Sequence, residues 1–313
     1  MIIWSDTKEN CQKILQLYKN ICSFVGLPVC EEKTLKEPVQ VIVYLGLLID
    51  VPRKLIKAPM DKVYRALDMI NTLLASKQVK VALLASFTGL MNFLTRPMEF
   101  IPVYLRRFYD LIGGKQQSDI ISLSAECKLD VVVLQKFLLY YNGCSLMVHS
   151  MAEQPQLLQS DASFWGMSYV YQKYYMAAAW PKQLMNTSPS ICLLEAIPLG
   201  CAFVTLGFIM SDSYILVKTD NEALVSILNK KSSKCPRIQQ VIRLITTQCL
   251  KYNIKFKVEH IRSRQNIDCD LLSRSQQEQF LARHRGEHLV PLQPPESLWP
   301  WSSTKLRHSL GWL

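Results

Sequence analysis

The chain has 313 residues, of which 49% are hydrophobic and 19% are charged, a composition that excludes a disordered protein and allows two domains with separate cores. A net charge of +11 suits a polyanionic partner, either nucleic acid or an anionic membrane surface, but it also serves simple solubility. The ten cysteines show no CxxC pair and no Cys/His ligand spacing, which argues against zinc and predicts reduced thiols in an intracellular protein.

The first 145 residues are expected to form a small mixed segment followed by helices. Apolar residues at helical spacing predict a helix over residues 6–25, and the β-branched stretch 39–51 predicts a hairpin that bends at Gly46. Further helices are expected over residues 60–77, 79–94, 103–112 and 130–141.

From residue 155 onward strands alternate with helices. Three strands fall within residues 155–181, and a helix follows from Ile191 to about Met210 with Ser188 as its N-cap. A strand ending at Asp220, two helices, another strand and a last short helix complete the order β-β-β-α-β-α-α-β-α. This order predicts an α/β fold with a five-stranded mixed sheet flanked by helices.

Two segments need separate comment. The longest apolar run, residues 191–210, is long enough to cross a membrane, but its internal Glu195 and Pro198 favour a buried helix of a soluble domain. Beyond Gln276 the periodicity fades, so residues 277–313 are expected to form an irregular C-terminal linker.

Four carboxylates fall at the ends of these elements. Asp161 ends the first strand of the sheet and Asp220 ends the fourth, while Glu195 and Asp270 lie in the first turns of helices. Strand ends of such a sheet meet at one edge, where four carboxylates would repel one another unless cations neutralised them. Oxygen ligands without His or Cys favour Mg²⁺ or Mn²⁺, and two such ions can hydrolyse phosphodiesters. Each carboxylate taken alone is better explained as a helix cap or a solvated loop residue, so the prediction rests on their joint placement.

The stretch "NIDCDLLSR" (266–274) holds two aspartates two residues apart. On a helix such neighbours point about 200° away from each other, so both cannot serve one site. Asp270 is the predicted site residue, and Asp268 is expected to be a helix cap or a solvent-facing charge.

These motifs resemble those of a known family. "QSDAS" with Gly166, "LLEA", "KTDN" and "NIDCDLLSR" match, in order and spacing, the four motifs of a type I ribonuclease H domain. The resemblance implies a two-metal site with Mg²⁺ (or Mn²⁺) that cleaves the RNA strand of RNA–DNA hybrids, with the ligands and catalytic residues Asp161, Glu195, Asp220 and Asp270. Ser168 replaces a glycine usual in this family, Arg262-Ser263 replaces a Pro-Gly turn, and Cys269 replaces an alanine.

The rest of the chain resembles the region that precedes such a domain in retroelement polymerases. "GLPVCEEKT" and "VYLGLLID" are similar to the end of the palm with its primer-grip hairpin, and "RKLIKAPMDKV", "ASFTGLMNFLTRP" and "YLRRFYDLI" are similar to the thumb and connection. "LNKKSSKCPRIQQVIR" and "PPESLWPW" are most similar to DIRS/Ngaro-type retrotransposons, whose elements carry a tyrosine recombinase.

This resemblance implies a division into a partial palm (1–58), a helical thumb or connection (59–148), a ribonuclease H-like domain (149–276) and the linker (277–313). The paired aspartates of the polymerase would precede residue 10, and the fingers are missing. No polymerase activity is therefore expected from this chain alone.

Basic and polar residues near the four motifs are candidates for binding a nucleic acid. The loop of Lys230, Lys231, Lys234 and Arg237 can grip phosphates or can be a solvated basic loop. Further candidates are Arg264 and Arg274 for phosphates, Ser163 and Asn221 for the RNA 2′-hydroxyl, and Lys54, Lys57, Arg106 and Arg107 for the duplex backbone.

Two functions are consistent with the sequence. The first is an RNA–DNA hybrid endoribonuclease, and the intact set of four carboxylates favours it. The second is a catalytically inactive nucleic-acid-binding relic of a retroelement polymerase, which the missing polymerase core favours.

Overall fold

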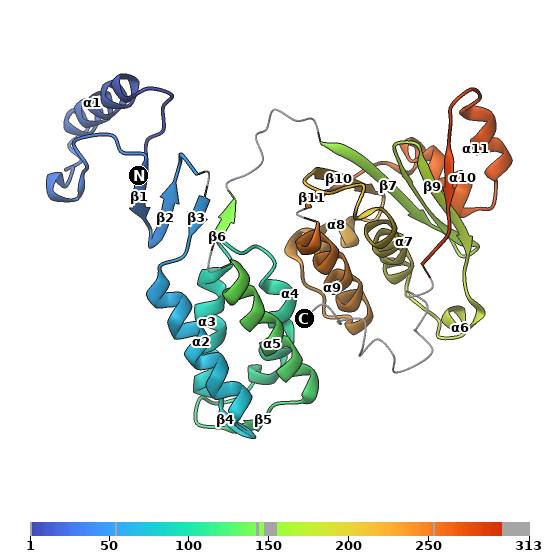
Figure 1. Ribbon diagram of the computed structural model, residues 1–313, viewed down its shortest axis with the longest axis horizontal. Coiled ribbons are helices and arrows are strands. Elements are labelled where there is room, and N and C mark those ends of the chain that lie inside the picture. The colour runs from blue at the N-terminus through green and yellow to red at the C-terminus, as the bar shows by residue number, and fades with distance from the viewer. Residues whose placement is uncertain (1, 54, 142–143, 147–154, 253, 296–313) are drawn as a thin grey trace.

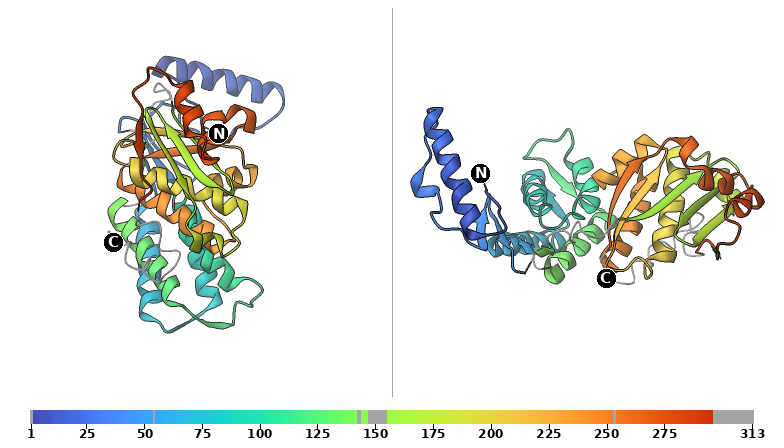
Figure 2. Two further views of the ribbon diagram at one scale, coloured as in Figure 1. Left: turned by 90° about the vertical axis from the view of Figure 1, so that its right-hand side faces the viewer. Right: turned by 90° about the horizontal axis from the view of Figure 1, so that it is seen from above.

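The computed structural model describes residues 2–53, 55–141, 144–146, 155–252 and 254–295. Along the long axis of the molecule a small N-terminal segment, a helical bundle and a sheet with its helices follow one another (Figure 1, Figure 2). The mixed α/β class predicted from the sequence is confirmed. No helix within these described ranges is both long and apolar enough to cross a membrane.

The N-terminal segment consists of α1 (Lys8–Phe24) and a small antiparallel sheet. The hydroxyl of Thr7 caps α1 by accepting a hydrogen bond from the Asn10 N–H, at 3.2 Å. Strands β1 (Val41–Tyr44) and β2 (Leu47–Asp50) form the predicted hairpin, and both residues of its turn, Leu45 and Gly46, have positive φ, as a tight primed turn requires. The sheet continues through β3 (Leu55–Lys57) to β6 (Cys144–Leu146).

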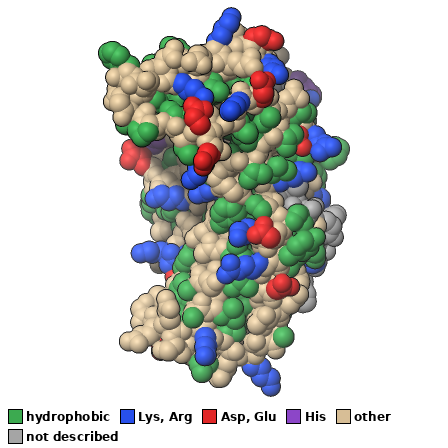
Figure 3. Space-filling model, turned by 90° about the vertical axis from the view of Figure 1, so that its left-hand side faces the viewer, with side chains coloured by type: hydrophobic (Ala, Val, Ile, Leu, Met, Phe, Trp, Pro, Cys, Tyr) green, Lys and Arg blue, Asp and Glu red, His purple; other side chains and the backbone are tan. Residues whose placement is uncertain are grey.

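Much of the N-terminal segment is apolar and exposed. The side of the molecule shown in Figure 3 has hydrophobic side chains interspersed with basic and acidic ones. Phe24 is 91% exposed and Leu45 is 69% exposed, while Cys22 is the buried residue of α1. Packing therefore holds α1 weakly.

The helical bundle is formed by α2 (Met60–Ala75), α3 (Val81–Leu94), α4 (Pro102–Ile112) and α5 (Ala125–Tyr141). A short ribbon of β4 (Gln78–Lys80) and β5 (Ile120–Ser122) lies at one end of it. Helix α5 begins earlier than the predicted residue 130, because the Ser124 hydroxyl accepts the Cys127 N–H and starts the helix there.

The large sheet contains the five predicted strands, β7 (Gln156–Ala162), β8 (Gly166–Tyr171), β9 (Tyr174–Ala179), β10 (Tyr214–Thr219) and β11 (Lys255–His260). Its order is β11-β10-β7-β8-β9-β12, in which β7, β8 and β9 are antiparallel neighbours. Strands β7, β10 and β11 run parallel, which requires the crossover helices α7 (Ile191–Leu206), α8 (Glu222–Lys230) and α9 (Pro236–Lys251). A four-residue helix, α6 (Lys182–Met185), precedes α7.

The predicted C-terminal linker is wrong for residues 277–292. Helix α11 (Gln277–Arg283) packs the fully buried Phe280 against Tyr175 and Leu272, and β12 (Val290–Leu292) extends the sheet by pairing in parallel with β9. The sequence hides both elements, because α11 has no side-chain N-cap and a three-residue strand is too short to show alternation. Residues 296–313 of the expected linker lie outside the described residues.

The two faces of the sheet carry different cores because successive strand residues point to opposite faces. Met167, Tyr169 and Tyr171 of β8 belong to the core shared with α7, whereas Val170 packs with the small cluster beside α10 (Ile267–Ser273) and α11. Helix α7 is buried nearly all round and begins at Ser190, which accepts the Leu193 N–H. The predicted cap Ser188 is wrong, since Ser188 lies two residues before the cap with a positive φ.

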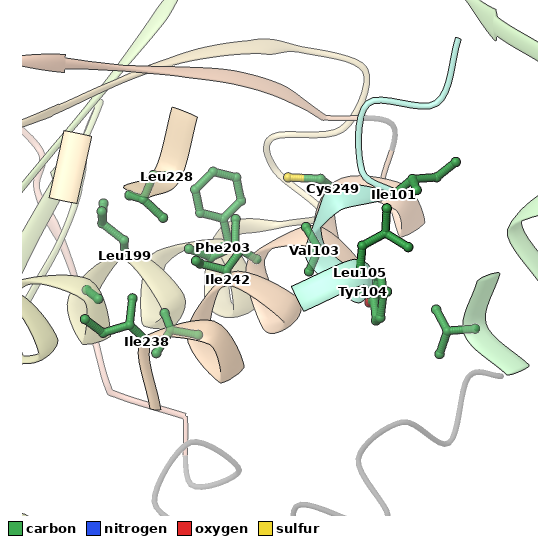
Figure 4. Close-up of a cluster of buried hydrophobic side chains, with 14 of the residues drawn as sticks. Ile101, Val103, Tyr104, Leu105, Leu199, Phe203, Leu228, Ile238, Ile242 and Cys249 are labelled. Atoms are coloured by element: carbon green, nitrogen blue, oxygen red, sulfur yellow. The ribbon is translucent and has the colours of Figure 1, made fainter. Parts of the chain in front are cut away.

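The helical bundle and the sheet unit share one hydrophobic core across their contact. Figure 4 shows Val103 of α4 beside Phe203 of α7 and Ile242 of α9, with Tyr104 and Leu105 of α4 farther along the same cluster. Because the core is continuous, the bundle and the sheet unit are packed against each other in a fixed arrangement.

Buried polar contacts accompany this core. The Gln239 side chain of α9 donates to the Val103 carbonyl at 2.7 Å. The carboxylate of Asp130 on α5 accepts from Arg107 of α4 at 2.7 Å and from Arg243 of α9 at 2.8 Å. Burial raises the pKa of Asp130, an effect that the two arginines oppose.

Candidate metal-binding site

Three of the four predicted carboxylates converge. Oxygen atoms of Asp161, Glu195 and Asp220 all lie within 4.8 Å of one another, and Asp161 and Glu195 are buried. Within the part of the chain that the structure describes, these three form the one group of side chains close enough together to bind a metal ion.

Each of the three comes from a different element. Asp161 is near the end of β7 and Asp220 follows β10, and these neighbouring parallel strands end at the same edge of the sheet. Glu195 reaches this edge from the second turn of α7, which packs against β7 and β8. Gly166 permits the close packing here, because a Cβ at this position would lie 2.6 Å from the Ala178 carbonyl oxygen and 3.2 Å from that of Ser273.

Glu195 is the carboxylate of the group whose pKa is raised most. Its Oε2 atom is buried and has no hydrogen-bond partner among the described residues. The pKa of Glu195 is raised to about 9, first by burial and then by the charges of Asp161 and Asp220, against a backbone hydrogen bond from Ala162 that lowers it. Without a cation this carboxyl therefore holds a proton at neutral pH, and a bound cation would favour its ionised form and give the buried oxygen a partner.

Asp161 shows a weaker version of the same effect. Its pKa is raised to about 6 by burial and by the charges of Asp220 and Asp270, while the Ser273 hydroxyl opposes the rise by donating a hydrogen bond. The donor Ser273 is fully buried in the same motif as Asp270 and was not among the predicted site residues. Its position in "CDLLSR", one turn after Asp270, is the signal that could have indicated it.

Serines stand at two of the three departures from the ribonuclease H motifs and have structural roles. Ser263, in the place of the Pro-Gly turn, donates its hydroxyl to the Asp220 carboxylate at 2.7 Å. Ser168, in the place of a glycine, is fully buried and donates to the Cys269 carbonyl at 2.7 Å, which ties β8 to α10. Neither substitution opens the site, and Ser263 adds a donor to it.

Asp270 lies beside the three carboxylates and outside their 4.8 Å group. Its carboxylate accepts a hydrogen bond from Arg274 Nε at 2.7 Å, yet its charge still affects Asp161. Asp268 turns the other way and forms ion pairs with Arg283 at 3.0 Å and His284 at 3.1 Å. The two aspartates are therefore separated as predicted, but Asp268 anchors α11 and is neither a cap nor a free surface charge.

The predicted basic loop is divided by the fold. Lys230 and Lys234 are exposed, and Arg237 is half-buried and donates to the Thr187 hydroxyl at 2.7 Å. The prediction that Lys231 contacts phosphates is wrong, because its side chain is only 12% exposed. Its ammonium group lies 3.4 Å from Glu99 and about 5.5 Å from the Phe100 and Phe256 rings. Its left-handed backbone at the end of α8 turns it into the contact between the two units.

Ser163 and Asn221 also have internal roles. The Ser163 hydroxyl donates to the Ser273 carbonyl at 2.7 Å and accepts from the N–H groups of Trp165 and Gly166, which uses its one proton and both lone pairs. This leaves Ser163 no capacity to read a 2′-hydroxyl. Asn221 caps α8 through its side-chain oxygen and retains its amide NH₂ as a donor.

The remaining basic candidates differ in their availability. Arg264 and Arg274 are exposed beside the carboxylates. In the bundle, Arg106 pairs with Asp110 and Arg107 with the buried Asp130, so Arg107 is a structural residue rather than one that tracks a duplex. Lys57 is half-buried in β3, and Lys54 lies outside the described residues.

Comparison with known proteins gives distant likenesses only. No protein-family model matches the chain, and no curated protein matches it. A solved foamy viral protease–reverse transcriptase in complex with an RNA/DNA hybrid is 15% identical with a TM-score of 0.38, covering 82% of this chain and 34% of that one. The dRH form of that protein with double-stranded DNA is 16% identical with a TM-score of 0.37, covering 82% and 44%. This chain thus spans less than half the length of either, and likenesses this weak carry no argument about function.

Proposed function

We propose that this chain is a retroelement-type ribonuclease H that hydrolyses the RNA strand of RNA–DNA hybrids. The observation that supports it is the convergence of Asp161, Glu195 and Asp220 at the edge where parallel strands β7 and β10 end. The order of β7 to β11 and the crossover helices agree with the ribonuclease H-like sheet expected from the motifs. We also propose the sequence-based domain division, with the ribonuclease-like unit extended through residue 292.

The donor set suits divalent magnesium or manganese. Carboxylate oxygens are hard ligands, which these ions prefer. A cation would give the buried Glu195 oxygen a partner, and it would favour the ionised forms of Glu195 and Asp161, whose pKa values are raised without it. Two ions held there would supply an activated water and a stabilised leaving oxygen for phosphodiester hydrolysis. Ser273 and Ser263 would hold Asp161 and Asp220 in place by their hydrogen bonds.

Asp270 completes the set once Arg274 releases it. The ion pair is half-exposed on both sides, so breaking it costs about 1 kcal/mol or less. A phosphate of the scissile strand can replace Asp270 as the partner of Arg274. Lys230, Lys234, Arg264 and the Asn221 amide are the remaining groups positioned to contact the hybrid.

The deciding test is cleavage of a hybrid whose RNA strand is end-labelled, in the presence of Mg²⁺. We expect the wild-type chain to cut the RNA strand of the hybrid and to leave single-stranded RNA and duplex DNA intact. Asp220→Asn should remove this activity, whereas Glu222→Gln, an exposed acid in the next helix turn, should retain it. Equal cleavage by the wild type and Asp220→Asn would contradict the proposal.

The pairing of Asp270 with Arg274 favours a second candidate. If Arg274 neutralises Asp270 permanently, the chain is an inactive nucleic-acid-binding relic of a retroelement polymerase. Binding of the hybrid without any cleavage in Mg²⁺ or Mn²⁺ would support this candidate. The DIRS/Ngaro-type origin belongs to the proposal on the strength of the sequence motifs.

A further inference from the structure

Two large aromatic side chains stand exposed beside the carboxylates. Phe164 is 70% exposed and Trp165 is 72% exposed, at the tip of the hairpin between β7 and β8. They follow Asp161 by three and four residues, so their Cα atoms lie no farther than about 10 and 13 Å from that of Asp161, the reach of an extended chain. We call these two residues the aromatic tip.

The aromatic tip is held rigidly by the residues around it. The Ser163 N–H donates to the Gly166 carbonyl at 2.9 Å and closes the turn. The Ser163 hydroxyl accepts the Trp165 N–H at 3.0 Å and donates to Ser273, and Trp180 Nε1 donates to the Ser163 carbonyl at 2.7 Å. Ser163 thus fixes the turn from both sides. A turn so fixed loses little conformational entropy when its side chains bind something.

The surroundings indicate what this ligand is. Two side chains cover far less than the roughly 800 Å² per partner that a stable protein–protein contact needs. An anionic membrane surface is disfavoured because three carboxylates lie at the base of the tip. A nucleic acid suits both the charged groups and the aromatic tip. Cations at the carboxylates and the exposed Arg264 and Arg274 neutralise its phosphates, and its bases and sugars offer apolar faces to Phe164 and Trp165.

We propose that the aromatic tip packs into the minor groove of the RNA–DNA hybrid, against sugars and base edges next to the scissile phosphate. An A-like minor groove is wide and shallow and presents these surfaces to a protein. The tip then positions the duplex, so that the carboxylates meet one phosphate of the RNA strand. The identity of the ligand rests on the proposed function, but the role of the tip is measured by binding and does not require turnover.

The test compares Phe164→Ala, Trp165→Ala and the double variant with the wild type. Affinity for a fluorescein-labelled 18-base-pair RNA–DNA hybrid is measured by anisotropy with Ca²⁺ in place of Mg²⁺, so that a divalent cation still neutralises the carboxylates, and affinity for heparin, a polyanion without bases, is measured in parallel. Phe208→Ala is the matched control, because Phe208 is 79% exposed at the opposite end of α7. Thermal melting checks that each variant is folded.

We expect each tip variant to bind the hybrid about tenfold more weakly, and the double variant weaker still, with heparin affinity unchanged. Binding within twofold of the wild type for all tip variants overturns the proposal, as does an equal loss towards heparin or a wild-type chain that binds no hybrid. A wild type that binds the hybrid but never cleaves it overturns the proposed enzymatic function alone, and the affinity ratios still decide the role of the tip.

Discussion

At the scale of single residues, position on a short helix decides which aspartate lies near the three converging carboxylates. Asp268 and Asp270 share α10, yet Asp268 pairs with Arg283 and His284 while Asp270 lies near Asp161. The helical rotation between neighbours separates an anchor from a candidate ligand.

Asp270→Asn should therefore lower hybrid cleavage by at least about 100-fold, because it removes a charge from the metal-binding set. Asp268→Asn should retain most of the cleavage, since its partners lie on α11. Initial rates at saturating Mg²⁺ measure both. A larger loss in Asp268→Asn would show that the assignment of the two faces is wrong.

Glu195 makes the stability of the metal-free protein dependent on pH. Its pKa of about 9 in the folded chain lies above the ordinary 4.5, so the folded state holds more protons than the unfolded state between these values. The free energy of unfolding must then fall as pH rises through this window, by at most about 1.4 kcal/mol per pH unit for one proton. Asp161 adds the same trend between 3.8 and about 6.

In EDTA, the melting temperature of the wild type should decline between pH 5 and pH 8 more steeply than that of Glu195→Gln. Addition of Mg²⁺ at pH 8 should raise the wild-type melting temperature and raise that of Glu195→Gln less, because a ligand that binds only the folded state stabilises it. Parallel pH profiles for the two proteins would contradict the assigned burial of this charge.

At the scale of secondary structure, α11 and β12 show how an element without a strong local signal is stabilised by contacts. Phe280 is fully buried against Tyr175 and Leu272, and its ring contacts that of His284 at a tilt. Asp268 of α10 pairs with the same His284 at the end of α11. The stability of α11 therefore comes from packing against β9 and α10, because so short a helix is not stable by its own propensity.

Phe280→Ala should release α11 and β12 locally, since truncation of a buried Phe costs about 3–5 kcal/mol. Hydrogen exchange of residues 277–292 should accelerate strongly, and that of β10 should change little. Leu281→Ala is the matched control, because Leu281 is 42% exposed on the same helix. Similar exchange in the two variants would mean that Phe280 does not hold these elements.

At the scale of the whole molecule, the bundle and the sheet unit are joined by charges as well as by apolar contacts. Asp130 accepts from Arg107 of its own unit and from Arg243 of the other, and Lys231 points into the same contact. Because these groups are largely buried, removing one partner leaves the others uncompensated.

Asp130→Ala should lower the free energy of unfolding by about 3–5 kcal/mol in urea titrations. Asp110→Ala, which removes only the exposed partner of Arg106, should cost about 1 kcal/mol or less. Equal losses in the two variants would contradict a docked arrangement. Faster hydrogen exchange in both α4 and α9 of Asp130→Ala would locate the loss at the contact between the units.

The sequence by itself determined the order of strands β7 to β11 along the chain and indicated the three carboxylates that converge, because strand alternation, helical spacing and short motifs are local properties. Only the tertiary structure decided that Ser263 donates to Asp220 and Ser273 to Asp161, that Lys231 faces the bundle, and that β12 extends the sheet beyond β9. Each of these depends on residues distant in the sequence, whose proximity no local pattern encodes. The same holds for the exposed Phe164 and Trp165, which a sequence pattern cannot distinguish from core aromatics.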